Sequence, residues 1–346
     1  MPTDLHRPSP LNPSTIVQVT QAVSDRNWAI HLTTKDDFLL VNRYDSGVEI
    51  LSHLQVVLNP PRAKDSYQLR TAFQLKFRHL AKKLIVAIQD YQPKLQGGGA
   101  IGFLKDLYPQ EKDFFLSFVD VQELYGAWKK YKEGTHFAVL GHSIFPYFGT
   151  YAPTRVSHLE LFATWLHSYQ GKKTTAVDVG TGCGILAFML SKRGFANVFA
   201  TDNNPNAIHS VNLELKRSEK SAYYIQTICC DLLTKAPANA DLIVFNPPWM
   251  MGKPSSIIDG ALYFEAGLFP RFFAQAWQML SDNGRIAILF SNIIQLVQPT
   301  VPHPIASELS KGRFTLVKKI QRRVKPSKKN KKTKEKVEVW ELAKRT

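Results

Sequence analysis

The segment from Val177 to Gly184 constrains the fold most, because a glycine-rich turn there joins two different apolar patterns. Residues 174–179 form a short, mostly apolar run that is typical of a buried strand. Residues 184–194 carry apolar side chains at helical spacing, namely Ile185, Leu186, Phe188, Met189 and Leu190. Glycine has no Cβ and tolerates positive φ, so the backbone of such a turn can approach a ligand closely. The segment therefore predicts a strand, turn and helix that bind a nucleotide-like cofactor.

Two further strand candidates each lead to an acidic residue. Residues 197–201 are followed by Asp202, about twenty residues after the glycines, where a carboxylate can accept both hydroxyl groups of a ribose. Residues 223–229 run into Asp231, which is placed to accept from an adenine amino group. Parallel strands that alternate with helices end at the same edge of a sheet, so these carboxylates are expected to lie near the glycine turn.

A fourth strand candidate, residues 241–245, ends in the sequence Asn246-Pro247-Pro248-Trp249. The glycine turn, the two acidic strand ends and this motif, in this order, resemble the class I S-adenosylmethionine (SAM) methyltransferases over roughly residues 150–346. The similarity is closest to the small-domain ribosomal RNA guanine N2 and the release-factor and ribosomal-protein glutamine N5 methyltransferases. It implies an α/β fold with a Rossmann-like, doubly wound sheet of seven strands, six parallel and one antiparallel.

The resemblance also implies the cofactor, SAM, and the residues that hold it. The glycine backbone would hold the methionine end, Asp178 would lie near its ammonium group, and a segment preceding the first strand would cross over the cofactor. The candidate cofactor-binding residues are Asp178, Gly180, Gly182, Gly184, Asp202, Asp231, Tyr151 and Thr154. Two alternatives stay open: Asp178 could instead cap the following helix, and the segment that holds Tyr151 and Thr154 could be a packed linker.

The motif at 246–249 carries the candidate catalytic residues Asn246, Pro247 and Trp249. Consecutive prolines stiffen the backbone and lack an N–H, which leaves the carbonyl of Pro247 free to accept a hydrogen bond. The side-chain oxygen of Asn246 is a second acceptor. Two acceptors that converge on one amino group suit a planar nitrogen, whose lone pair they would aim at the methyl group, while Trp249 stacks on the plane. No general base is strictly required, and the alternative is a proline-rich turn.

Basic charge is concentrated at the end of the chain. Residues 313–346 hold fourteen basic and three acidic side chains, which is +11 of the net charge of +16. If residues 314–324 and 337–343 are the last two strands, the turn between them lies at the edge where open α/β sheets bind ligands. Its cations could neutralise phosphates without reading sequence, or simply keep the protein soluble. The candidate phosphate contacts are Arg322, Arg323, Lys328, Lys329, Lys331, Lys332 and Lys334.

These patterns predict an N-methyltransferase that acts on an exocyclic base amine of ribosomal or transfer RNA, with RNA or the ribosome as its partner. A glutamine of a release factor or ribosomal protein is the alternative substrate; it is disfavoured because Trp249 stands where the glutamine enzymes typically carry tyrosine. DNA is a third and weaker candidate substrate. A different class stays open as well, a non-catalytic RNA-binding protein with a degenerate methyltransferase domain.

Ahead of the sheet, residues 69–91 repeat apolar side chains every three or four positions, which predicts a helix in a mainly helical N-terminal domain. Residues 28–32 and 38–41 look strand-like and leave the class of that domain open. The predicted organisation is a disordered lead-in at 1–15, a candidate substrate-recognition domain at 16–133, a connecting segment and helix at 134–171, and the methyltransferase domain at 172–346 with a basic hairpin loop at 325–336.

Several classes of protein are disfavoured by composition. The three cysteines give neither a disulfide framework nor the spacing of a zinc site, so no metal is expected. No apolar run reaches the roughly 18 residues of a membrane span, and the first residues lack the apolar core of a signal peptide. We therefore expect a cytoplasmic protein that is not bound to a membrane.

Overall fold

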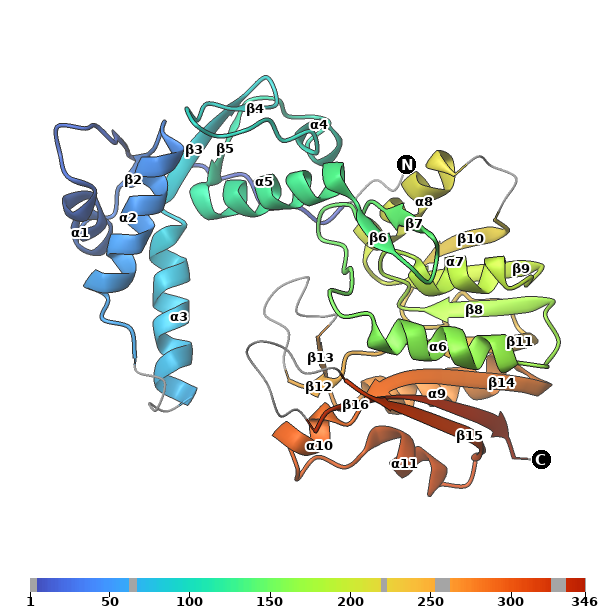
Figure 1. The fold of residues 1–346 in the computed structure, drawn as a ribbon. Helices are drawn as coiled ribbons and strands as arrows, with labels where there is room; N and C mark the ends of the chain where they lie inside the picture. The colour runs from blue at the N-terminus through green and yellow to red at the C-terminus, as the bar shows by residue number, and fades with distance from the viewer. Residues whose placement is uncertain (1–4, 62–66, 219–222, 253–261, 325–333, 346) are drawn as a thin grey trace. The chain divides into compact units, whose positions relative to one another are not determined.

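The computed structural model describes residues 5–61, 67–218, 223–252, 262–324 and 334–345 (Figure 1). The chain divides into two compact units, residues 6–129 and residues 130–346 together with 1–5, and each is described by itself. In these described ranges, no helix has both the length and the apolar character that crossing a membrane requires.

The unit of residues 6–129 combines helices with a five-stranded sheet (Figure 1). Strands β1, β2 and β3 run parallel, and both β4 and β5 pair antiparallel with β3. The elements are β1 Ile16–Gln18, α1 Asp25–Thr34, β2 Phe38–Leu40, α2 Tyr44–Val57, α3 Tyr67–Ala81, β3 Leu84–Gln89, β4 Gln92–Pro93, α4 Leu104–Leu107, β5 Phe114–Ser117 and α5 Phe118–Glu133. The unit is therefore mixed α/β, and the expectation of a mainly helical domain missed its sheet.

The predicted helix over residues 69–91 is wrong in its second half. Helix α3 ends at Ala81, and the following residues form strand β3 in the middle of the sheet. Leu84, Ile85, Val86 and Ile88 are all buried there. A strand covered on both faces is apolar at nearly every position, so a helical repeat can continue into it without a visible break.

Residues 28–32, which look strand-like in the sequence, lie inside helix α1. Ser24 caps that helix, because its side chain accepts a hydrogen bond from the amide of Asn27 at 3.3 Å. Trp28, Ala29 and Leu32 are buried on one face at helical spacing. The strand-like residues 38–41 do contain a strand, β2.

The predicted disorder of residues 1–15 does not hold for residues 7–11. The hydroxyl of Tyr108 donates to the carbonyl of Pro8 at 2.7 Å, and the amide of Leu11 donates to the carbonyl of Phe115 at 2.9 Å. Arg7 lies over the ring of Tyr108, 4.8 Å from its centroid. Composition alone missed this segment because its contacts are made mostly by backbone groups.

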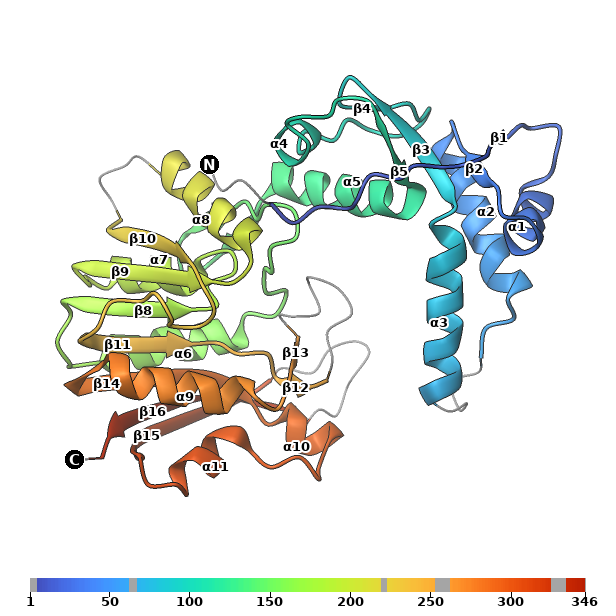
Figure 2. The ribbon, with the colours of Figure 1, turned by 180° about the vertical axis from the view of Figure 1, so that it is seen from behind.

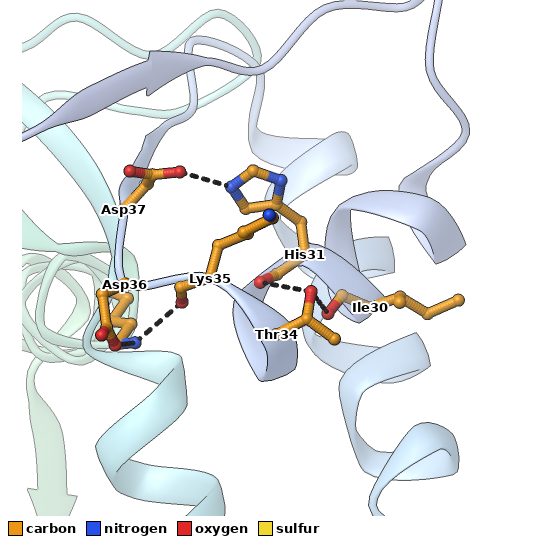
Figure 3. A network of polar contacts seen from close by, with 7 residues as sticks. Ile30, His31, Thr34, Lys35, Asp36 and Asp37 are labelled. Carbon is orange, nitrogen blue, oxygen red and sulfur yellow. Dashed lines mark hydrogen bonds and ion pairs between the residues drawn. The ribbon is translucent and has the colours of Figure 1, made fainter.

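The turn from α1 into β2 is fixed by a network of polar contacts (Figure 3). His31 Nε2 lies 3.0 Å from a carboxylate oxygen of Asp37. The ammonium group of Lys83, at the start of β3, reaches the carbonyl of Lys35 at 3.0 Å and the carboxylate of Asp36 at 2.9 Å. These contacts connect the end of α1 to the neighbouring strand of the sheet.

The second unit is built on a seven-stranded sheet with the order β10-β9-β8-β11-β14-β16-β15 (Figures 1 and 2). Six strands run parallel, and β16 is antiparallel to both of its neighbours. Its strands are β8 Thr175–Val179, β9 Asn197–Asp202, β10 Ile225–Cys229, β11 Ala240–Phe245, β14 Leu280–Ser291, β15 Phe314–Arg323 and β16 Lys336–Lys344. The predicted Rossmann-like, doubly wound fold is confirmed.

Helices cover both faces of this sheet (Figures 1 and 2). Alternate residues of each strand face opposite sides, as strand geometry requires. In β11, Leu242 and Val244 pack into one buried cluster with α6, α7 and α8, whereas Ile243 and Phe245 pack into the other with α9 and α11. The helices are α6 Ser157–Ser168, α7 Ile185–Lys192, α8 Pro205–Arg217, α9 Leu268–Met279, α10 Ile293–Val297 and α11 Pro304–Leu309.

Two small pairs of strands complete the described part of this unit. Strands β6 (Thr135–Phe137) and β7 (His142–Ile144) form an antiparallel pair ahead of α6. Strands β12 (Met250–Met251) and β13 (Tyr263–Phe264) pair in parallel directly after the 246–249 motif. The residues between β12 and β13 at 253–261 are not described, but both strands lie on the cavity presented below.

We expect Gly184→Ala to destabilise the chain more than Gly194→Ala. These glycines flank α7 in left-handed backbone, with φ of +87° and +92°, so each alanine adds about 1–2 kcal/mol of strain. At 184 the new Cβ would also lie 2.9 Å from Phe188 and 3.0 Å from Val211, whereas nothing lies within 4 Å at 194. Overpacking should add about 1–3 kcal/mol. Urea unfolding measures both losses, and equal losses would contradict the packing role of Gly184.

Candidate active site

A cavity of about 640 Å³ lies at the carboxyl ends of β8, β9, β10 and β11. Its volume is in the range of pockets that enclose one small organic ligand. Nine of the predicted site residues line it: Tyr151, Thr154, Gly180, Gly182, Asp202, Asp231, Asn246, Pro247 and Trp249. The fold therefore brings together side chains that are spread over about a hundred positions of the sequence, as parallel strands ending at one edge allow.

The glycine turn presents bare backbone to this cavity. Gly180 and Gly182 both have positive φ, +64° and +53°, which side chains rarely adopt. The amide of Gly182 donates to a carboxylate oxygen of Asp202 at 2.9 Å. A Cβ on Gly182 would lie 3.1 Å from the carbonyl oxygen of Tyr151, so only glycine leaves the turn room to pass beneath that segment.

The segment that carries Tyr151 lies across the glycine turn and is held there. The carbonyl of Tyr151 accepts from the amide of Cys183 at 3.2 Å. Asn204, the N-cap of α8, donates from its side chain to the carbonyl of Gly149 at 2.8 Å. Asn206 does the same for Phe148 at 2.9 Å. These hydrogen bonds hold the segment against the turn, as both a crossing segment and a packed linker require, so contact of Tyr151 and Thr154 with a cofactor stays a prediction.

The two acidic strand ends differ in their surroundings. Asp202 is half-buried, and its carboxylate accepts from the amides of Gly182 and Asn204, both at 2.9 Å. Burial raises the pKa of Asp202, and these hydrogen bonds act against that shift. Asp231 forms an ion pair with Arg271 of α9, which also lines the cavity and which the sequence analysis missed. Its signal, one arginine on a predicted helix, was too common to single out.

Asp178 does not line the cavity but lies buried beneath the glycine turn. One carboxylate oxygen accepts from the hydroxyl of Thr181 at 2.7 Å and from the amide of Ala187, in the first turn of α7, at 3.0 Å. The other oxygen has no hydrogen-bond partner. This placement favours the alternative role of a helix cap, and contact with a ligand ammonium stays a prediction. Gly184, also predicted to contact the cofactor, does not line the cavity either.

The 246–249 motif presents unsatisfied polar atoms. The side-chain oxygen of Asn246 and the indole nitrogen of Trp249 are both buried and have no hydrogen-bond partner among the residues that the structure describes. An unpaired buried polar group costs about 1–3 kcal/mol, so two in one cavity indicate a site that a ligand completes. Asn246 offers an acceptor and Trp249 a donor.

His158, the second residue of α6, is a cavity-lining residue that the sequence analysis did not predict. Its ring meets that of Trp249 edge to face, with centroids 5.2 Å apart and planes at 86°. Burial lowers the pKa of His158 to about 4, so the imidazole is neutral at physiological pH. Its Nε2 also has no hydrogen-bond partner in the described part of the chain. A single histidine among the apolar residues of a helix gave no signal in the sequence.

The predicted phosphate contacts lie partly outside the described residues, as Lys328, Lys329, Lys331 and Lys332 do. Arg322 is exposed and forms an ion pair with Glu160 of α6 at 3.1 Å. Arg323 and Lys334 are exposed at the two ends of the predicted hairpin loop, and the adjacent Glu335 lines the cavity. In the described part of the chain no group of three or more His, Cys, Asp or Glu could hold a metal; the expected absence of a metal stays a prediction.

The strand order, the single antiparallel strand and a cavity built on the glycine turn define the Rossmann-like fold of the class I SAM methyltransferases. Residues 158–301 match the family model described as the methyltransferase small domain, so this part of the chain is similar to that family. The match confirms the predicted enzyme class, and with it SAM as the family's cofactor.

Known proteins resemble parts of the chain. A Methanocaldococcus jannaschii protein provisionally named a protein N5-glutamine methyltransferase is 24% identical over 129 residues, covering 35% of this chain and 64% of that protein. The tRNA1(Val) (adenine(37)-N6)-methyltransferase of Glaesserella parasuis is 31% identical over 117 residues, covering 33% and 49%. A solved ribosomal protein L11 methylase from Lactobacillus delbrueckii subsp. bulgaricus is 20% identical, with a TM-score of 0.40 and coverage of 57% and 82%. The chain spans less than two thirds of both curated relatives.

We expect Asp178→Asn to change how stability depends on pH. Burial raises the pKa of Asp178 from 3.8 to about 7, so the folded chain favours the protonated carboxyl. The stability that this group contributes is complete below pH 3.8 and is lost as pH rises through 7. Asparagine does not ionise, so its variant escapes this loss. The unfolding free energy of the variant minus that of the wild type should therefore increase by up to about 4 kcal/mol from pH 4 to pH 8. Urea unfolding across that range measures the gain, and a difference that is constant with pH would contradict it.

Proposed function

We propose that this chain transfers a methyl group from SAM to an exocyclic amine of a base in ribosomal or transfer RNA. The observation that carries the proposal is the unpartnered side-chain oxygen of Asn246, buried in the cavity that the glycine turn also lines. The same cavity thus holds an acceptor for an amino group and a glycine backbone that a nucleotide-like cofactor can approach closely.

The described residues fit SAM. The bare backbone at Gly180 and Gly182 suits the close approach of the methionine end. A carboxylate oxygen has two lone pairs, so Asp202 keeps acceptor capacity for ribose hydroxyls beyond the two amides it already serves. When bound, SAM supplies a methyl group that its sulfonium has already activated, and the protein contributes mainly orientation and electrostatics.

The motif would orient the nitrogen that is methylated. The side-chain oxygen of Asn246 and the carbonyl oxygen of Pro247 would each accept one proton of the amino group, and both residues line the cavity. Held in this way, the nitrogen turns its lone pair away from the plane of the base. Trp249 would stack on that plane, which restricts the substrate to flat groups.

RNA is the favoured substrate because basic charge lies beside the cavity. Strand β15 runs parallel to β8 and β11, so its end at Arg323 lies at the same edge as Asn246. Glu335, where the chain returns from the hairpin loop, lines the cavity itself. Arg323 and Lys334, which flank the basic segment, would therefore meet phosphates while a base occupies the cavity. The relative named as a transfer RNA adenine N6-methyltransferase agrees with this substrate class.

A protein glutamine is the second candidate, and the relative named as a glutamine methyltransferase supports it. The carboxamide of glutamine is planar and offers the same two protons to Asn246 and Pro247 as a base amine does. The basic segment would not oppose this substrate, since ribosomal proteins lie among RNA. DNA stays a weaker candidate. A non-catalytic RNA-binding role is disfavoured because the cavity is intact at Gly180, Asp202 and Asn246.

The N-terminal unit is proposed to recognise the substrate. Arg70, Lys76 and Arg78 of α3 are exposed, and cations on one helix can bind a phosphate backbone.

A cytoplasmic location stays a prediction.

We expect the wild-type chain to transfer label from methyl-labelled SAM to RNA. Total RNA and ribosomal protein, each isolated from cells that lack this protein, are incubated separately with the full chain. Label that ribonuclease removes would support the RNA proposal. Label only in protein would overturn it in favour of glutamine, and heat of SAM binding with no label in either fraction would favour the non-catalytic class.

We expect Asn246→Ala to lower turnover by about 100-fold or more, because removing one preorganised group costs that much in comparable sites. Binding of SAM, measured by calorimetry, should change little, since Asn246 is assigned to the substrate. Asn197→Ala is the matched control. Asn197 begins β9 at the opposite edge of the sheet, and its exposed side chain donates to the carbonyl of Thr174. Unchanged turnover of the Asn246 variant would remove the motif from the mechanism.

A further inference from the structure

Methylation of an amine releases a proton. The transfer does not strictly require a base, but a basic group in the cavity would take up this proton and speed turnover. The substrate nitrogen forms a bond to the methyl carbon as the carbon–sulfur bond breaks, and that bonding pair stays on sulfur. The nitrogen then carries a positive charge until one N–H bond breaks. The oxygens of Asn246 and Pro247 are amide oxygens, which accept hydrogen bonds but are too weakly basic to keep a proton.

We propose that His158 is a catalytic residue of this reaction, and that its Nε2 accepts the proton that leaves the methylated nitrogen. The inference rests on the proposed function and adds a base to it. The imidazole lines the same cavity as Asn246 and contacts Trp249, the residue assigned to stack on the substrate. Its Nε2 is buried and has no hydrogen-bond partner among the described residues, so it keeps a lone pair that no described group uses.

The protonation state of His158 suits this role. Burial alone lowers its pKa to about 4, so the ring is neutral and able to accept at physiological pH. An exocyclic amine that has just been alkylated is a far stronger acid than imidazolium, because its ring draws electrons from it. Transfer to His158 is therefore downhill, and the low pKa lets the imidazolium pass the proton to water quickly.

The charged groups near α6 are paired with other residues and not with His158. Arg155 and Glu335, which line the cavity, pair with each other at 3.0 Å. On α6 itself Glu160 pairs with Arg322 at 3.1 Å. Glu341 of β16 accepts from the indole nitrogen of Trp165 at 2.9 Å. No charge among these is directed at the imidazole, which agrees with burial as the cause of its shift.

The test compares His158→Gln with the wild type in the labelled-methyl assay on the substrate fraction. Glutamine keeps a hydrogen-bonding group but is not a base, so turnover should fall by about 100-fold while SAM binding and KM stay near wild type. His142→Gln is the matched control, because His142 of β7 also has a buried, unpartnered Nε2 but does not line the cavity. It should keep wild-type turnover. Wild-type turnover of His158→Gln would overturn the proposal.

A second variant separates basicity from packing. His158→Ala should lose turnover, and added imidazole should restore part of it with a pH dependence near 6.5, the ordinary pKa of the imidazole group. Turnover that imidazole does not restore would show that the ring only fills space, and would overturn the inference. If the wild type labels no fraction, the proposed function fails first and the inference falls with it; if the wild type and His158→Gln label equally, only the inference fails.

Discussion

The parallel pairing of β8 with β9 and β11 is the constraint on which the site depends. Two parallel strands need a crossover connection that runs back to the edge where the first strand began. The carboxyl ends of β8, β9 and β11 therefore lie at one edge of the sheet. The turn after β8 can therefore donate from Gly182 to Asp202, the last residue of β9, at 2.9 Å. Asn246 then follows the end of β11 at the same edge. The cavity is thus a consequence of strand direction, and its chemistry is set by the residues that happen to end the strands.

The sheet of the second unit could be predicted from the sequence because its central strands β8, β9 and β11 are short, mostly apolar and separated by recognisable turns. The N-terminal unit could not, for two physical reasons. Strand β3 is covered on both faces, so its apolar run has no period that distinguishes it from the helix before it. Residues 7–11 are held mainly by backbone hydrogen bonds and by one cation over an aromatic ring, neither of which leaves a pattern in composition.

In the site, too, residues at strand ends could be predicted from motif spacing, whereas side chains placed by tertiary packing could not. Motif spacing identified Asp202, Asp231 and Asn246, because each stands at a strand end. It could not tell that Asp178 turns inward to Thr181 and α7, since a strand-end residue may face either the cavity or the helix beneath it. Nor could it find His158, whose placement against Trp249 requires the helix α6 to dock on the sheet. Side-chain direction and long-range contact are the information that a linear pattern lacks.

Charge is divided between the interior of the site and its surroundings in a way that suits two different ligands. Within the cavity both arginines, Arg155 and Arg271, are paired with carboxylates, whereas Asp202 has no ion-pair partner in the described residues. A cationic cofactor would meet no free positive charge there. The exposed basic side chains of β15 lie instead outside the cavity lining, where a polyanion would be attracted from solution. A free cation inside the cavity would repel the sulfonium, so keeping the cations of β15 outside it would let one edge of the sheet serve a cation and a polyanion together.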